Sequence, residues 1–113
     1  MIISKDESFT EEEIQKLSGK FETYIKAVID IKRKVCSAGA NLHFENEQFL
    51  LKQGSKQSDL WGGGIELMTK IIDNNAMINL RPTHNNFSNE IQDPEKRQKF
   101  EDLMRFFFKE LLK

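Results

Sequence analysis

Two short stretches of this chain carry polar side chains at a spacing that could form a binding site. Gln57 and Asp59 are two residues apart, and Asn79 and Arg81 have the same spacing. On extended backbone such pairs project from one face, so Asp59 and Arg81 can meet if their segments are neighbouring strands. A guanidinium held by one carboxylate still has donors free for a ligand carboxylate or phosphate.

The loop after Arg81 adds two further polar residues to this predicted site. The candidate ligand-binding residues are therefore Gln57, Asp59, Asn79, Arg81, Asn86 and Ser88. They predict a noncatalytic binding or regulatory module for a small anionic ligand or a peptide. The competing interpretation is structural, with Asp59 and Arg81 forming an ion pair that only holds the sheet together.

A second candidate for chemistry is the pair His43 and Glu45. On a strand both side chains would point to one face and could exchange protons, with Arg81 stabilising a developing negative charge. That alternative is a small hydrolase or ribonuclease-like enzyme, and it requires His43 and Arg81 to open into one cleft. A metal site would need a third ligand, but His84 is the only other histidine and no HExxH spacing occurs. We expect no metal and no cofactor.

The only tryptophan lies directly before three consecutive glycines, in "DLWGGG" at residues 59–64. Neither the GxGxxG fingerprint nor the GxxxxGK phosphate loop is present. We therefore expect Gly62–Gly64 to permit a bend or bulge where the chain leaves the sheet. Trp61 is predicted to be a large core residue that anchors this strand.

These residues must be positioned by a single domain, because 113 residues with 38% hydrophobic content suffice for one core. Thr10 and Glu13 form a capping-box pattern at the start of an N-terminal helix. Within residues 23–35 apolar and charged side chains alternate, which predicts a strand with one buried face, although Ile25, Val28 and Ile29 also fit a helix. Residues 42–51 form an extended or partly helical segment. Apolar runs at 65–72 and 76–82 predict further strands. The sequence thus predicts an α+β fold of two layers, an antiparallel meander of three or four strands against N- and C-terminal helices.

The C-terminal helix has the clearest signals. Asp93 occupies the N-cap position, Pro94 the first helical position, and an apolar stripe follows. Phe106 and Leu112 widen this stripe on both sides. The helix end is either sunk into its own core or forms a homodimer contact through these two residues.

Composition limits the function classes. The net charge of −1 and the pI near 6.1 argue against nonspecific binding to nucleic acid. The single cysteine cannot form an internal disulfide, which is typical of a reducing compartment. We find no signal peptide and no apolar run long enough to span a membrane, so we expect a cytoplasmic protein without membrane contact.

Five segments together resemble a family of small bacterial proteins known only as a domain of unknown function. They run in order between about residues 24 and 97 and are AVIDIKRKV, AGANLH, GSKQSDLWG, MINLRP followed by NFS, and IQDPEKR. The most specific are the motifs GSxQxDLWG and MINxRP. The resemblance also covers Asp30, His43, Asn79, Arg81, Asn86, Ser88, Asp93 and Arg97.

This sequence departs from the family pattern at three places. Glu45 replaces a more usual Asp, Lys32 replaces an acid, and the glycine run follows Trp61 where relatives carry a longer strand and loop. His84 matches no family position. The resemblance implies one shared fold and one polar cluster, and it implies no activity.

Overall fold

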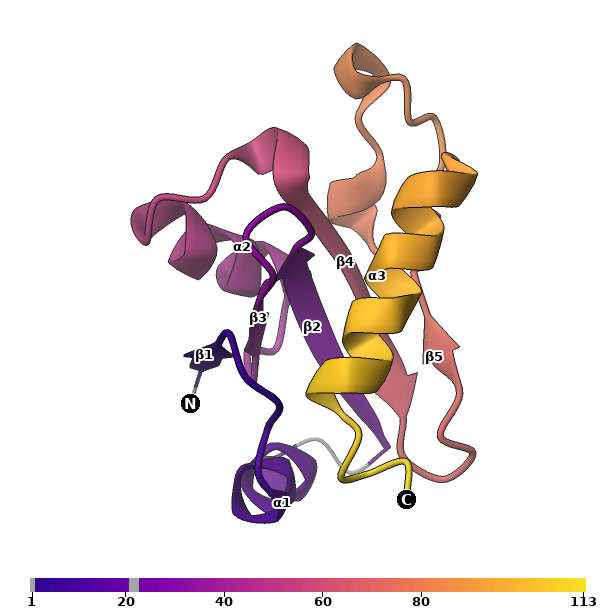
Figure 1. Cartoon of the computed structure of the whole chain (residues 1–113). Helices are drawn as coiled ribbons and strands as arrows, with labels where there is room; N and C mark the ends of the chain where they lie inside the picture. Colours follow the sequence, from indigo (N-terminus) through magenta and orange to yellow (C-terminus); the bar gives the residue numbers. More distant parts are fainter. Residues whose placement is uncertain (1, 21–22) are drawn as a thin grey trace.

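The structure, a computed structural model, describes residues 2–20 and 23–113 and is built around a five-stranded antiparallel sheet (Figure 1). The strand order is β1-β3-β2-β4-β5. The strands are β1 (Ile3–Lys5), β2 (Tyr24–Asp30), β3 (Val35–Ala38), β4 (Leu60–Glu66) and β5 (Ile72–Asp73). The predicted α+β class is confirmed. The sheet contains five strands, and β1 pairs with β3 rather than with its neighbour in sequence.

The alternation that predicted the first long strand determines how β2 sits in the sheet. Ile25, Ala27 and Ile29 are fully buried and belong to the main hydrophobic core, whereas Val28 packs into a separate cluster with Leu50. Neighbouring residues of a strand face opposite sides, so β2 contributes to two cores. Both faces of the sheet are consequently covered.

Two helices cover one face of the sheet, α1 (Glu11–Lys20) and α3 (Pro94–Phe107). The capping box of α1 is confirmed, because Thr10 N donates to Glu13 Oε1 at 2.9 Å and Glu13 N donates to Thr10 Oγ1 at 3.1 Å. The N-cap of α3 is also confirmed, with Asp93 Oδ1 accepting from Glu95 N at 2.9 Å.

The end of α3 is largely sunk into the protein's own core. Phe107 and Phe108 are fully buried, and Leu112 packs against the same core. Phe106 remains 43% exposed and contacts the Phe107 ring edge-on. A homodimer through Phe106 stays a prediction.

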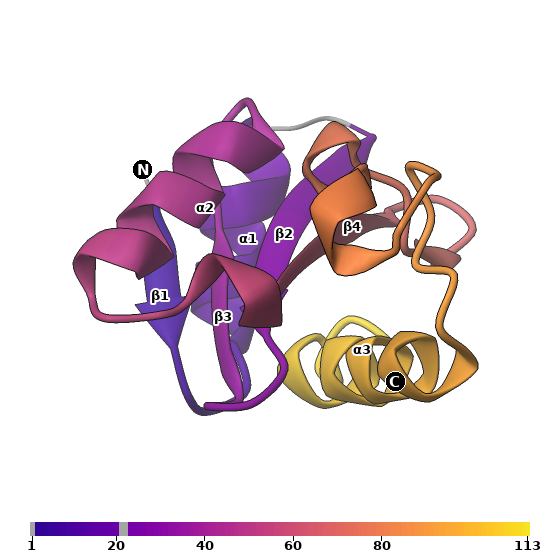
Figure 2. The same ribbon diagram turned by 90° about the horizontal axis from the view of Figure 1, so that it is seen from above.

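A third helix, α2 (His43–Lys52), lies on the opposite face of the sheet from α3 (Figure 2). The sequence allowed an extended conformation here, which is wrong, because residues 43–52 are helical. Glu45 Oε1 accepts from Leu42 N at 3.2 Å and so stabilises the helix start. Leu50 and Leu51 then pack onto the sheet side of the helix.

The glycine run is not a bend at the end of a strand, as we predicted, but the middle of β4. Gly62, Gly63 and Gly64 pair in register with Val28, Ala27 and Lys26 of β2. The reason for glycine is close approach rather than chain reversal. A Cβ atom on Gly63, for example, would lie 2.7 Å from the Phe100 ring of α3. Trp61 is 1% exposed and belongs to the main core, as predicted.

The predicted strand at 76–82 is wrong as well. Met77–Asn79 and Pro82–His84 form single turns of 3₁₀ helix, η2 and η3, and Arg81 makes only an isolated bridge with Asn86. Asn79 and Arg81 are buried while Met77 and Leu80 are exposed, the reverse of an ordinary strand with one apolar face. Another short 3₁₀ turn, η1, spans Gln57–Asp59 before β4. Among the described residues, no helix is long and apolar enough to cross a membrane.

Candidate functional site

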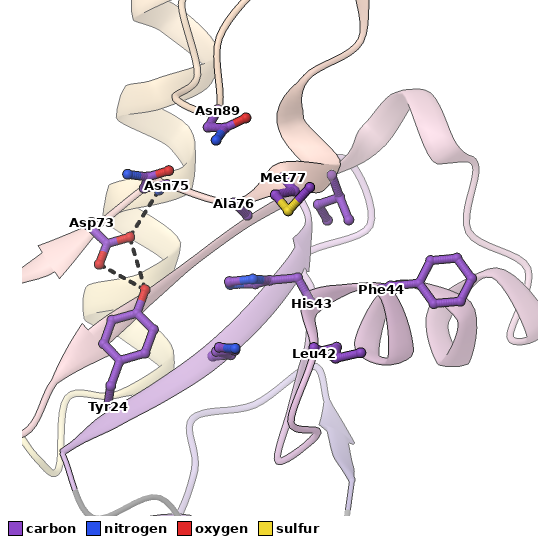
Figure 3. Close-up of a pocket in the computed structure, with 11 residues that line it drawn as sticks. Tyr24, Leu42, His43, Phe44, Asp73, Asn75, Ala76, Met77 and Asn89 are labelled. Carbon is purple, nitrogen blue, oxygen red and sulfur yellow. Dashed lines mark hydrogen bonds between the residues drawn. The ribbon is translucent and has the colours of Figure 1, made fainter.

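A groove of about 760 Å³ lies on the α2 side of the sheet, between the start of α2 and the segment from β5 to η2 (Figure 3). This volume is in the range of small-molecule sites. The groove is lined by Tyr24, Lys26, Leu42, His43, Phe44, Asp73, Asn75, Ala76, Met77, Ile78 and Asn89.

Two glycines of β4 keep the floor of the groove low. A Cβ on Gly62 would lie 2.7 Å from Ala76 Cβ and 3.2 Å from the His43 ring. A Cβ on Gly64 would collide with the Tyr24 ring. Because Gly62 and Gly64 have no side chains, Tyr24 and His43 can lie across the strand, and the groove exists as a consequence.

His43 lies between the polar and the apolar ends of the groove. Its Nε2 is 2.7 Å from Gly63 O, and since a carbonyl oxygen only accepts, Nε2 carries the hydrogen. Burial lowers the pKa of His43, and the positive charge of Lys26 lowers it further, against the opposing effects of Gly63 O and Asp73. The ring is therefore neutral at pH 7, with a lone pair on Nδ1.

The polar end of the groove is organised around Asp73. The Tyr24 hydroxyl donates to its carboxylate at 2.8 Å, and Asn75 N donates to Oδ1 at 2.9 Å. Burial and this carboxylate raise the pKa of Tyr24, so the phenol stays protonated. Both Asp73 oxygens thus accept hydrogen bonds from within the protein, as Figure 3 shows.

The apolar end of the groove consists of exposed side chains. Leu42 and Phe44 at the start of α2 are 56% and 57% exposed, and Met77 of η2 is 82% exposed. Leu42 and Met77 lie on either side of His43 (Figure 3). Exposed apolar side chains beside a hollow are typical of a contact surface.

Arg81 does not line this groove, and the structure places it 7% exposed beside Leu60 at the start of β4. Its Nε donates to Ile78 O at 2.8 Å, its Nη1 to Gln57 O at 2.6 Å, and its Nη2 to Leu60 O. Its guanidinium carbon also lies 4.6 Å from the centre of the Trp61 ring. Arg81 therefore ties η1, η2 and β4 together.

The predicted ion pair between Asp59 and Arg81 is wrong. The carboxylate beside Arg81 is Glu47 of α2, with its Oε2 at 3.9 Å from Arg81 Nη2 and only 3% of the residue exposed. Burial raises the pKa of Glu47, although Arg81 and the Gln57 side chain act to lower it. Asp59 lies instead by Lys32 and Lys96, in a smaller hollow of about 320 Å³ near the start of α3.

The side chains of Asn79 and Asn86 form hydrogen bonds to backbone groups of neighbouring segments. The amide of Asn79 accepts from Gly62 N at 2.8 Å and donates to Gly62 O at 2.9 Å, beyond the point where β5 stops pairing with β4. Asn86 Nδ2 donates to Asn79 O at 2.7 Å, and Asn86 Oδ1 accepts from Gln92 N. Ser88 Oγ accepts from Glu90 N at 3.0 Å.

The structure thus gathers Asn79, Arg81 and Asn86 into a buried cluster, to which Gln57 contributes its carbonyl oxygen, and leaves Asp59 outside it. A ligand-binding role for the six residues stays a prediction. His43 and Glu45 are not paired, since Glu45 bonds to Leu42 N and His43 to Gly63 O. His43 and Arg81 do not open into one cleft. In the described part of the chain, no group of three His, Cys, Asp or Glu side chains could hold a metal ion.

Sequence reasoning missed most of the groove. Tyr24 and Lys26 lie on the polar face of the correctly predicted strand, but that face was not interpreted as a site. Asp73 lies between the apolar runs at 65–72 and 76–82, where the sequence predicted no site residue. The exposed apolar side chains of Leu42, Phe44 and Met77 mark the groove, but their exposure can be recognised only once the fold is known.

A small α+β domain with an open groove and a buried polar cluster describes this class of protein. Residues 1–107 match the model of the family described as "Protein of unknown function (DUF5674)", and the chain belongs to that family. The resemblance noted from the sequence motifs, to a family of unknown function, is confirmed. No curated protein and no solved structure matches the chain.

Proposed function

We propose that this protein is a noncatalytic binding module and that its ligand occupies the groove between α2 and η2. The observation that carries the proposal is the combination of a hollow of about 760 Å³ with a glycine floor and exposed Leu42, Phe44 and Met77 at its apolar end. A ligand that covers these side chains removes apolar surface from water, which favours binding by about 25 cal/mol per Å² of buried apolar area.

The predicted cluster around Arg81 has a supporting role in this proposal. Asn79 fixes Gly62 of β4 and also donates to Asn74 O and Asn89 O, so it links the floor of the groove to one of its walls. Arg81 holds η2 through Ile78 O. Ligand contact is thereby assigned to the groove residues, and the position of the wall to the buried cluster.

The proposal is tested by NMR with ¹⁵N-labelled protein, for which 13.2 kDa is a convenient size. The probes are a panel of small aromatic and aliphatic acids, amines and alcohols, each titrated separately. We expect compounds that bind to shift the protein's amide signals mainly at residues 24–26, 42–44 and 73–77. Shifts spread over α1 and α3, or no binder at all, would contradict the proposal.

A pair of matched variants makes the test sharper. Met77→Ser removes an 82% exposed side chain of the groove, and Met68→Ser removes an 84% exposed side chain of the turn after β4, outside the groove. Neither change disturbs the core. We expect Met77→Ser to weaken binding several-fold and Met68→Ser to leave it unchanged, and equal effects would count against the groove.

A further inference from the structure

The chemistry of the groove also restricts the kind of ligand it can take, and this step rests on the proposed function. The lining of the groove contains one lysine, Lys26, and one acidic residue, Asp73. Asp73 already accepts from the Tyr24 hydroxyl and from Asn75 N. Lys26 has no carboxylate within 4.0 Å among the described residues and donates only to Asn41 O, at 2.8 Å.

Lys26 is a partly exposed residue, and its ammonium has two N–H donors left for a ligand. An anionic group is the partner that uses both the charge and these donors, because hydrogen bonds between ionised groups are about twice as strong as neutral ones. The neighbouring ring of His43 adds a different requirement. Its Nε2 hydrogen is bound to Gly63 O, so its Nδ1 can only accept.

A ligand that pairs with Lys26 and His43 thus combines an anionic group with a nearby N–H donor. It also carries an apolar side chain that contacts Leu42 and Met77. The last residue of a peptide has these three features together: a carboxylate, the amide N–H of the same residue, and its side chain. We propose that the groove binds the C-terminal end of a peptide or protein whose last residue is apolar.

In this arrangement the terminal carboxylate accepts from Lys26 Nζ and the terminal amide N–H donates to His43 Nδ1. The last side chain lies between Leu42 and Met77, which flank His43 in Figure 3. The open outline of the groove accommodates the preceding residues of the partner. Asp73 lies at the Tyr24 end of the groove, where it accepts from the Tyr24 hydroxyl and from Asn75 N.

Three probes distinguish this ligand class from its neighbours by NMR titration of the full chain. They are N-acetyl-Ala-Leu with a free carboxylate, the same dipeptide with a C-terminal amide, and 4-methylpentanoate, which has the carboxylate and the apolar branch but no amide. We expect the free acid to bind in the groove and the amidated dipeptide to bind about tenfold more weakly, the loss that follows from one charge-assisted hydrogen bond. We expect 4-methylpentanoate to bind more weakly than the free acid.

Two lysine variants assign the difference to Lys26. Lys26→Met is expected to reduce the affinity for the free acid to that of the amide, and Lys52→Met, an exposed lysine of α2 outside the groove, is expected to change nothing. The comparison of acid and amide uses the wild-type chain, so it stands even if Lys26→Met folds poorly.

The outcomes separate this inference from the proposed function. Equal binding of acid and amide in the groove, or an affinity that Lys26→Met leaves unchanged, overturns the assignment to peptide C-termini while the groove remains a binding site. Binding of 4-methylpentanoate as tight as that of the dipeptide acid overturns the peptide as the source of the carboxylate. If neither these three probes nor the panel of small compounds shifts the amide signals of the groove, both proposals are overturned.

Discussion

Asn79→Ala is expected to be among the most destabilising substitutions in this protein, although it replaces a polar residue. The side chain of Asn79 is fully buried and serves four backbone groups, the N–H and C=O of Gly62 and the carbonyls of Asn74 and Asn89. Truncation to alanine removes at once the Oδ1 acceptor and the two Nδ2 hydrogens that these three carbonyls share.

The magnitude depends on which of these groups can reach water afterwards. Asn74 is partly exposed and Asn89 is exposed, so their carbonyls can be rehydrated, and Asn89 O also keeps the hydrogen bond from Ala76 N. Gly62 is buried in β4, and β5 pairs only with Gly64 and Ile65, so no other strand can satisfy it. Each buried group left without a partner costs roughly 1–3 kcal/mol. We therefore expect a loss of about 2–6 kcal/mol, a large share of the usual 5–15 kcal/mol of a small domain.

The assay is urea denaturation of the wild type, Asn79→Ala and the control Asn75→Ala, followed by tryptophan fluorescence of the buried Trp61. Asn75 is exposed and lies in the same segment, and it bonds to Asp73 only through its backbone N–H. Its substitution should cost less than about 0.5 kcal/mol. A similar small loss for Asn79→Ala would refute the argument that its amide completes the edge of β4.

Two further predictions concern charged or titrating groups. Arg81→Ala should destabilise the protein by about 3–5 kcal/mol, because it removes the charge beside the buried Glu47 and the donors to three carbonyls. Asp59→Ala should change the stability by less than about 0.5 kcal/mol. Similar losses for the two variants in urea denaturation would contradict the finding that Asp59 and Arg81 are not paired. Because the pKa of His43 is lowered in the folded protein, the unfolded chain protonates His43 first as pH falls. The contribution of His43 to stability is therefore complete above its unfolded pKa of about 6.5 and decreases as pH falls from there through the folded pKa. The difference in melting temperature between wild type and His43→Gln should change over that interval, and a pH-independent difference would show that burial does not perturb the ring.

The elements that sequence reasoning predicted correctly depend on short-range patterns. The Thr10–Glu13 capping box, the Asp93 N-cap and the alternation along β2 involve residues two or three apart. The backbone geometry of a helix or strand fixes what such spacings mean, whatever the rest of the chain does. The same reasoning gave the burial of Trp61, because a large indole ring rarely stays in water.

Only the tertiary structure decided where the polar residues and the glycines would act. Asn79 bonds to Gly62 across 17 residues, His43 to Gly63 across 20, and Arg81 to Gln57 across 24. In each case a side chain binds to a backbone group, and a backbone group has no residue-specific signature in the sequence. The pattern of polar residues therefore indicated that Asn79 and Arg81 matter, but their partners, and the groove that the side-chain-free Gly62 and Gly64 open between α2 and η2, followed from how β4 packs against its neighbours.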